Sequence, residues 1–366
     1  MYLEKLRKYK VAILTEKFIP FYQSFIVGSD EEVMGFTALL KEEGLYLLFI
    51  AQLKRHLLFE FLPAKLREVC KRDYHLEKAY QLSQMHTITR MLAQVDSPKI
   101  FFKGIVLNHW LRTDVYKRSC DIDFLIKEKD IDKTVEQLEY LGFVKKKRVV
   151  PYGEFPMIKG KNLVLDVHYN INASSPYSKV FHFSGDDFFK ALCEIEIDGV
   201  AIPTFSLEMT FIHLCLHFII NHQASFFIQF YELMAFLRNN EAAMDTEKLL
   251  ELCRKHKVEN LLLIVLYMIR SFDPKVGQIL FDLLLISPDV NRLRIEKFVC
   301  KKDMPSRVVD QSLHVSQLSL SPVVLDSFAK KLYALYGYCF INAKVLYMTL
   351  KGEWSFSHKN QNALKS

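Results

Sequence analysis

The sequence is poor in tryptophan, in paired cysteines and in long apolar runs. Among its 366 residues there are only 2 tryptophans, and the 7 cysteines stand singly, without a Cys-x-x-Cys pair. The opening "MYLEKLRKYKVAIL" does not resemble a secretory signal, so we expect reduced, mostly buried thiols in a cytoplasmic protein. The longest unbroken apolar run, from Leu261 to Ile269, is far shorter than the roughly 18 residues of a membrane-spanning helix. These absences argue against a disulfide-stapled secreted domain and predict no membrane span.

A strong excess of one charge sign is also absent. Lys and Arg number 49 against 42 Asp and Glu, and the formal net charge of +7 suits an anionic partner such as a nucleotide without demanding nucleic acid. The only dense basic cluster is "KKKR", Lys145 to Arg148, which follows an expected helix end at Gly142. We interpret this cluster as the exposed end of a strand rather than as a nucleic-acid patch.

What the sequence does have is ample material for packed cores. Hydrophobic residues make up 50% of the chain and charged residues 25%, which is typical of globular proteins, and the length favours two or three packed units. Apolar residues recur at helical spacing near both ends and with period two in the middle. We therefore predict an α+β protein with a helical region at 1–97, a core with a small mixed β-sheet at 98–203, and a helical region at 204–366.

The middle block is expected to alternate between strands and helices. Asp130 is expected to cap an amphipathic helix, and Gly142 to end it in the left-handed conformation. The expected elements are a strand at 99–102, a helix at 104–113, a strand at 120–126, a helix at 130–143, and strands at 143–152 and 162–171 joined by a loop. Further along the chain, residues 287–323 are the least periodic and are expected to be rich in loops.

Two acids lie one residue apart in the expected strand "CDIDFLI". Residues i and i+2 of a strand project from one face about 6.6 Å apart, so Asp121 and Asp123 should point together. Asp166, in "LVLDVHYNI", lies on a strand expected beside the first. Like charges about 4 Å apart repel by roughly 4 kcal/mol at an effective dielectric near 20, so three converging carboxylates predict bound cations. The expected occupant is Mg²⁺, as one ion or a pair that also meets substrate phosphates, with Mn²⁺ as a substitute.

A phosphate-binding element is predicted upstream of these acids. The strand "KIFF" ends at Lys103-Gly104 and passes into a helix, which combines free helix amides, a glycine that permits close approach and a lysine. Arg118, three residues before Asp121, adds a fork-shaped donor for the same phosphates. We therefore predict that Lys103, Gly104 and Arg118 bind a nucleotide.

In this order, the motifs resemble a known family. "FFKGIVLNHWL", "RSCDIDFLI", "LEYLGF" and "LVLDVHYNI" are similar to the polymerase-beta-like nucleotidyltransferase superfamily. More narrowly they resemble its largely uncharacterised bacterial branch, whose members read KG, R-x-x-D-x-D-L-V and an acid-x-H strand. "FSLEMTFIHLCLHFIINH" is similar to the branch's downstream histidine-containing helix, and the residues after about 270 match no pattern of the family. One departure is Ile105, which follows Lys103-Gly104 where the superfamily usually has Gly-Ser or Gly-Gly, so a phosphate-binding hydroxyl is missing.

The resemblance implies metal-dependent transfer of a nucleoside monophosphate from an NTP to an acceptor, with release of pyrophosphate. By matching positions, Asp121 and Asp123 hold the metals, Asp166 completes the site and helps to activate the acceptor, and Lys103 and Gly104 meet the phosphates. The sequence identifies neither the NTP nor the acceptor. A small molecule, a sugar, a peptide, a protein side chain and an RNA end all stay open as acceptors.

Three histidines and one glutamate have two readings each. His168 shares a strand face with Asp166 and either contacts metal or substrate or makes a structural hydrogen bond. His213 and His217 have the i, i+4 spacing of a zinc pair, but the glutamate of His-Glu-x-x-His is missing, so we expect them to line the substrate cleft or to pack in a helical core. Glu232 matches an acidic position of the family helix and either orients one of these histidines or is structural.

Two other classes of function stay open. The first is a catalytically degenerate nucleotidyltransferase fold that serves as an interaction module, which the missing hydroxyl and the large helical regions favour and the third acid opposes. The second is a nucleotide-sugar glycosyltransferase with a D-x-D motif, although those enzymes lack the preceding Lys-Gly element between strand and helix. An enzyme that depends on a nucleotide sugar rather than on a plain NTP would belong to the second class.

Overall fold

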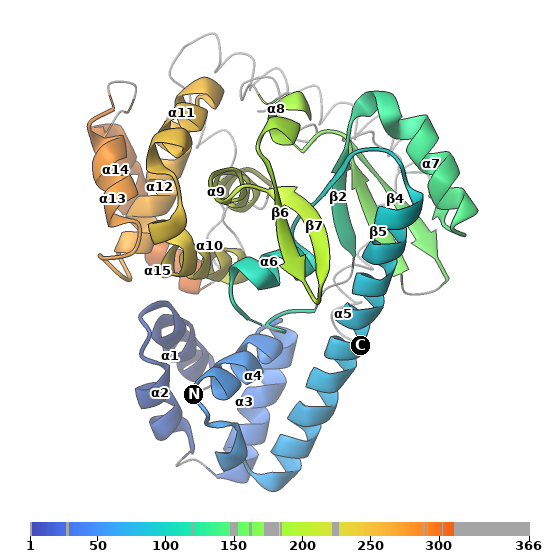
Figure 1. Ribbon diagram of the computed structural model, residues 1–366. Helices are drawn as coiled ribbons and strands as arrows, with labels where there is room; N and C mark the ends of the chain where they lie inside the picture. The colour runs from blue at the N-terminus through green and yellow to red at the C-terminus, as the bar shows by residue number, and fades with distance from the viewer. Residues whose placement is uncertain are drawn as a thin grey trace, which may run out of the picture. The chain divides into compact units, whose positions relative to one another are not determined.

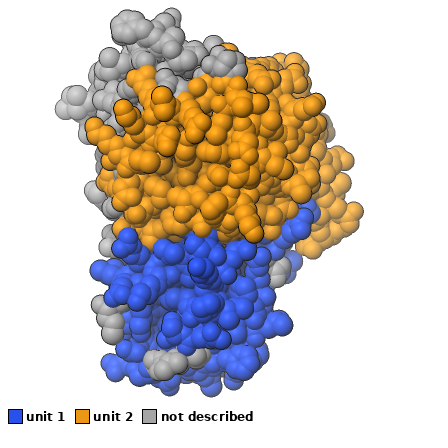
Figure 2. Space-filling view, turned by 90° about the vertical axis from the view of Figure 1, so that its left-hand side faces the viewer, with its two compact units in different colours: residues 1–94, 103–122, 356–366 blue, residues 95–102, 123–355 orange. Residues whose placement is uncertain are grey.

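A computed structural model gives the architecture of the chain (Figure 1). It describes residues 2–26, 29–113, 115–118, 121–146, 153–160, 163–171, 183, 185–221, 227–287, 290, 292–301 and 303–310. These residues divide between two compact units, coloured separately in Figure 2. The first unit is made of residues in the ranges 1–94 and 103–122, and the second of residues between 95 and 102 and from 123 onward.

Helices make up the first unit. Ser29 begins one of them, because its hydroxyl accepts a hydrogen bond from the backbone N–H of Glu32 and three acids follow in the first turn. The helices are α1 (Tyr2–Leu14), α2 (Phe18–Ile26), α3 (Asp30–Glu42), α4 (Tyr46–Arg55), the long α5 (Ala64–Gln94) and the short α6 (Gly104–Trp110), with a 3-10 turn at Phe59–Phe61.

Aromatic rings fill the core between α1, α2, α3 and α4. The ring of Tyr9 lies 5.5 to 6.2 Å from four phenylalanine rings, mostly edge to face. Such ring pairs add about 0.5–1.5 kcal/mol each beyond the burial of their area. We call this set the aromatic cluster; it consists of Tyr9, Phe18, Phe21, Phe25, Phe36 and Phe49.

The second unit is built around a five-stranded sheet with the strand order β1-β2-β5-β4-β3. Along the chain its strands are β1 (Lys99–Phe101), β2 (Ile122–Ile126), β3 (Val144–Lys145), β4 (Glu154–Lys159) and β5 (Leu163–His168), and α7 (Ile131–Tyr140) follows β2 after a 3-10 turn at Glu128–Asp130. The pairs β1–β2, β3–β4 and β4–β5 are antiparallel. All five residues of β2 are buried, which explains their nearly unbroken apolar character.

A β-hairpin lies between this sheet and the C-terminal helices in the view of Figure 1. Its strands β6 (Leu192–Ile197) and β7 (Val200–Phe205) are joined by Asp198-Gly199, both with positive φ, as a two-residue hairpin turn requires. The short helix α8 (Gly185–Lys190) precedes it. Strand, hairpin and helix side chains share one core, made of Ile100, Phe102, Leu125, Ile171, Phe188, Ala191, Phe205 and Met209.

The remaining described elements are helical. Ser206 caps α9 through its hydroxyl, and α9 runs into a π-helical turn at His217–Asn221. The helices are α9 (Leu207–Leu216), α10 (Phe227–Asn240), α11 (Thr246–His256), α12 (Glu259–Arg270), α13 (Gln278–Leu285), α14 (Arg292–Lys301) and α15 (Met304–Val309), with a 3-10 turn at Glu241–Ala243. Among the described helices, none combines the length and the apolar character needed to cross a lipid bilayer.

The predicted α+β class, with a small sheet and helical regions before and after it, is confirmed. The three predicted residue ranges stay a prediction, since the two compact units divide the chain by a different criterion. Gly142 has φ +86 and follows the end of α7, as expected, and Lys145 is an exposed strand residue.

Three local expectations were wrong, and one hairpin was missed. The side chain of Asp130 makes no capping hydrogen bond. Strand β4 occupies the predicted loop, and the hairpin β6–β7 was not foreseen. Within the described part of 287–323, the expected loops are the helices α14 and α15.

Candidate active site

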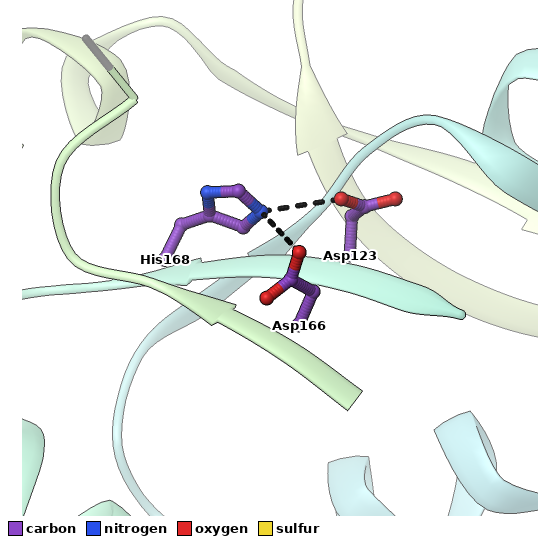
Figure 3. Close-up of side chains that lie close together, drawn as sticks. All are labelled: Asp123, Asp166 and His168. Carbon is purple, nitrogen blue, oxygen red and sulfur yellow. Dashed lines mark hydrogen bonds and ion pairs between the residues drawn. The ribbon is translucent and has the colours of Figure 1, made fainter. Parts of the chain in front are cut away.

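Two carboxylates and one imidazole meet on neighbouring strands of the sheet (Figure 3). Nε2 of His168 lies 3.2 Å from Oδ1 of Asp123 and 3.8 Å from Oδ2 of Asp166. One ligand atom of each residue lies within 4.8 Å of a ligand atom of each of the other two. Among the described residues, no other group of three or more His, Cys, Asp or Glu side chains has this metal-site spacing. We call these three residues the Asp-Asp-His cluster.

The strand pattern explains why these side chains meet. Asp166 and His168 are at positions i and i+2 of β5, so they share one face of the sheet. Asp123 stands on β2, the neighbour of β5 in the strand order. The side chains of Asp123 and His168 are only 6% and 7% exposed, so their charges and dipoles act at low effective dielectric.

A fourth polar residue, Glu154, holds the other side of the histidine ring. Glu154 is paired with His168 across β4 and β5, and its Oε2 lies 3.0 Å from Nδ1 of His168. The sequence analysis missed Glu154 because Gly153, Pro156 and Gly160 predicted a loop there. The apolar alternation of Phe155 and Met157 was the available signal for a strand, and Pro156 obscured it.

The histidines of the helical region approach the same neighbourhood through one phenylalanine. The ring of Phe102 lies 5.1 Å from that of His168 and 5.1 Å from that of His213, edge to face in both cases. His213 is buried in α9, and its ring stacks on that of His217 at 5.8 Å. Glu232 is 2% exposed in α10. Roles of His213, His217 and Glu232 in a substrate cleft stay predictions.

A zinc site at His213 and His217 gains no support. Within the described part of the chain, no third His, Cys, Asp or Glu joins these two histidines at metal-ligand spacing. A structural zinc ion needs four ligands and a catalytic one three, so a pair alone is insufficient.

The predicted phosphate residues belong to the first unit, together with Asp121. Lys103 and Gly104 begin α6 with φ values of +61 and +44, a conformation that non-glycine residues seldom adopt and that functional sites often contain. Helix α6 extends only from Gly104 to Trp110, so its dipole is small. The side chain of Arg118 is 65% exposed, and its Nε lies 3.9 Å from Oε2 of Glu77.

Helix α5 supplies two polar contacts to this segment that the sequence analysis also missed. Gln84, which is 1% exposed, donates a hydrogen bond of 3.0 Å from Nε2 to the backbone carbonyl of Asp121. Glu77, the partner of Arg118, lies two helical turns before it on the same helix and is 8% exposed. The available signal in the sequence was the seven-residue spacing of these two polar residues, which places them on one face of the helix.

The structure thus brings together Asp123, Asp166 and His168, and places Asp121, Lys103, Gly104 and Arg118 in the other compact unit. Metal binding by Asp121, Asp123 and Asp166, and nucleotide binding by Lys103, Gly104 and Arg118, stay predictions.

The donor set suits a divalent cation. Carboxylate oxygens and imidazole nitrogen are common metal ligands in proteins. Two donors that each lie about 2.1 Å from one ion are at most about 4.2 Å apart, and the 3.2 and 3.8 Å separations from His168 fall within that limit. A divalent ion held by such a set of donors can polarise a phosphoryl oxygen and orient a substrate.

Comparison with known proteins identifies the class. Residues 29–273 match the model of a family described as uncharacterised nucleotidyltransferases. The chain belongs to this family. No curated protein matches the chain. A solved structure of the antibiotic-resistance factor ANT(2'')-Ia is similar over 48% of this chain and 90% of its own, with 16% sequence identity and a TM-score of 0.34.

Proposed function

We propose that this protein transfers a nucleoside monophosphate from an NTP to an acceptor and releases pyrophosphate, with a divalent metal ion, Mg²⁺ in the first instance. The observation that carries the proposal is the buried Asp-Asp-His cluster on β2 and β5 in a chain of a nucleotidyltransferase family. The acceptor is left open, because a fold does not select a substrate.

In this proposal Asp123 and Asp166, with Asp121, hold the metal. A bound divalent ion supplies charge neutralisation at the phosphates and at the entering and leaving oxygens. The carboxylates of Asp123 and Asp166 are held within the sheet, so their orientation does not have to be organised during the reaction. One ion or two fit the proposal equally.

The protein's own groups then have distinct roles. Lys103 and Arg118 neutralise the phosphates of the NTP, and Asp166 accepts the proton of the acceptor's hydroxyl. The acceptor oxygen forms a bond to the α-phosphorus, the bond from the α-phosphorus to the oxygen that bridges to the β-phosphorus breaks, and pyrophosphate leaves with that oxygen. The largely exposed side chain of Arg118 is compatible with a role in contacting a ligand.

The test is thermal stability of the full chain with each NTP, with and without Mg²⁺. A ligand at 100 times its dissociation constant stabilises the folded state by about 2.7 kcal/mol, which a thermal shift detects. We expect one NTP to raise the melting temperature only with Mg²⁺, and the double variant Asp121→Asn, Asp123→Asn to lose that shift. The matched control is Asp132→Asn, which removes an exposed acid of α7 and should keep the shift.

The alternative outcomes are informative. A shift that persists in the double variant contradicts the metal assignment. No shift with any NTP favours the interaction module, and a shift with a nucleotide sugar alone favours a glycosyltransferase. Pyrophosphate release in the presence of the stabilising NTP then measures turnover directly.

A further inference from the structure

The contacts of the His168 ring influence which metal ion the site selects. This inference rests on the proposed function, because both require a metal ion at the Asp-Asp-His cluster. We propose that His168 is a nitrogen ligand of this metal through Nε2, and that Glu154 is the positioning residue that orients the ring. The site then binds Mn²⁺ or Co²⁺ more tightly than Mg²⁺.

Nε2 is the ring atom that faces both carboxylates. It lies 3.2 Å from Asp123 and 3.8 Å from Asp166, so all three donors surround one position (Figure 3). The three carboxylates of Asp123, Asp166 and Glu154 carry a formal charge of −3, and a protonated His168 leaves these four residues at −2. A divalent cation bound by a neutral His168 reduces the formal charge of the site to −1, which is more compensation than a proton on His168 alone provides.

Glu154 determines which nitrogen of His168 is available. Nδ1 lies 3.0 Å from Oε2 of Glu154, and an ionised carboxylate only accepts hydrogen bonds, so in the neutral ring that metal binding requires, Nδ1 carries the proton. The lone pair is then on Nε2, which is directed toward Asp123 and Asp166. A carboxylate that accepts from one nitrogen while the other binds metal is the usual outer partner of a metal-binding histidine.

The protein also restricts rotation of the ring. His168 is paired with Glu154 in the β4–β5 register, and the ring of Phe102 meets the imidazole edge to face at 5.1 Å. Because His168 is 6% exposed, the ring has little room to leave the cluster. A ligand fixed in this way binds metal without losing further side-chain freedom.

Nitrogen ligation changes the selectivity of the site. Mg²⁺ takes oxygen ligands and gives up its water reluctantly, so an imidazole adds little to its affinity. First-row transition ions gain from an imidazole, in the order Mn²⁺ below Co²⁺ for a given set of ligands. An all-carboxylate site would show a weaker preference.

The experiment titrates the full chain with MnCl₂, CoCl₂ and MgCl₂ in a calorimeter, without nucleotide. We expect Mn²⁺ and Co²⁺ to bind about tenfold or more tightly than Mg²⁺. Electron spin echo modulation of the bound Mn²⁺ should show coupling to a ¹⁴N nucleus, which reports a nitrogen ligand independently of activity.

Three substitutions separate the parts of the inference. His168→Gln should remove the ¹⁴N coupling and most of the preference for Mn²⁺ over Mg²⁺. Glu154→Leu should weaken Mn²⁺ binding by about 10- to 100-fold while Glu154→Gln, which keeps an acceptor for Nδ1, should lose less. The matched control is His256→Gln, since His256 is fully buried in α11 and stacks on Phe183; it should keep both the coupling and the affinity.

The outcomes distinguish this inference from the proposed function. Mn²⁺ that binds without ¹⁴N coupling, or with equal affinity in wild type and His168→Gln, overturns the role of His168 and leaves NTP binding intact. If no divalent ion binds with or without an NTP, the metal site fails and the proposed function fails with it. Equal affinities of Glu154→Leu and wild type overturn the positioning role of Glu154.

Discussion

The aromatic cluster of the first unit consists of buried rings, whereas the Asp-Asp-His cluster of the second consists of ionisable side chains, of which Asp123 and His168 are buried. Phe36 and Phe49 are fully buried and contact other rings, whereas Asp123 and His168 are also buried but contact ionisable groups. Burial of rings stabilises a fold by removing apolar area from water. Burial of carboxylates opposes folding unless partners or cations compensate. The difference fits a role of the first cluster in stability and the proposed role of the second in metal binding and chemistry.

The largest expected effect is on activity and comes from Asp123→Asn. The amide keeps the shape of the side chain but weakens metal binding, so the rate of pyrophosphate release should fall by about 10³-fold or more. The melting temperature should stay the same or rise slightly, because a repulsion with Asp166 is removed. Asp132→Asn is the control in the same assays, and an active Asp123→Asn protein would refute the division of roles between the clusters.

The next effect is on stability and comes from Phe36→Ala. Removing this ring from contact with Tyr9, Phe21, Phe25 and Phe49 should lower the free energy of unfolding of the first unit by about 3–5 kcal/mol. Urea unfolding followed by circular dichroism measures this loss. Mn²⁺ affinity should not change where the variant is folded, since the Asp-Asp-His cluster belongs to the second unit.

Leu3→Ala provides the comparison for Phe36→Ala. Leu3 lies on α1 of the same unit but is 73% exposed, so its truncation should change the free energy of unfolding by less than about 0.5 kcal/mol. Equal losses for the two variants would mean that the aromatic cluster does not stabilise the unit. Loss of Mn²⁺ affinity in folded Phe36→Ala would mean that the roles are not separate.

A smaller effect concerns a buried acid outside the cluster, Glu208. Burial by itself raises the pKa of Glu208, but hydrogen bonds from Ser206, from backbone N–H groups and from Lys248 outweigh it and hold the pKa below its usual range. A lowered pKa contributes stability above the unfolded value of about 4.3, and that contribution is lost as the pH falls through the folded value. Glu208→Gln should therefore destabilise the protein by about 1–2 kcal/mol at pH 7.

Urea unfolding of wild type and Glu208→Gln at several pH values checks this expectation. The difference between the two proteins should shrink as the pH falls from about 4.3 through the lowered folded pKa, because wild-type Glu208 is protonated in both states only below that folded value. A difference that is independent of pH would show that the charge of Glu208 does not contribute, in contrast to the carboxylates of the Asp-Asp-His cluster, whose role is expected to be catalytic.

The smallest effect concerns the turn of the hairpin. Gly199 has φ +77, and a Cβ atom there would meet no atom within 4 Å, so Gly199→Ala should cost only the backbone strain of about 1 kcal/mol. The melting temperature measures it. Gly44 of the first unit also has open surroundings, with φ +70, so Gly44→Ala should lower the melting temperature by a similar amount. A much larger decrease for Gly199→Ala would show that the hairpin stabilises the second unit more than its local geometry indicates.

Sequence reasoning succeeded where the pattern was local. Helical periodicity predicted the helical regions, Gly142 marked the end of α7, and the alternation around Asp123 and Asp166 predicted the strands β2 and β5. It failed where the signal was mixed. Pro156 hid β4, and with it Glu154, while the Asp198-Gly199 turn, a strong hairpin signal, was overlooked.

The sequence by itself determined the class of fold, the family and the strands on which Asp123, Asp166 and His168 stand, because periodicity and motif spacing are properties of short segments. Only the tertiary structure decided that Glu154 faces Nδ1 of His168, that Phe102 stands between two histidines, and that Gln84 meets the backbone of Asp121. These contacts join residues from 14 to more than 100 positions apart. Strand register, strand order and helix packing set them, and a one-residue slip in the pairing of β4 with β5 would turn Glu154 and His168 to opposite faces of the sheet.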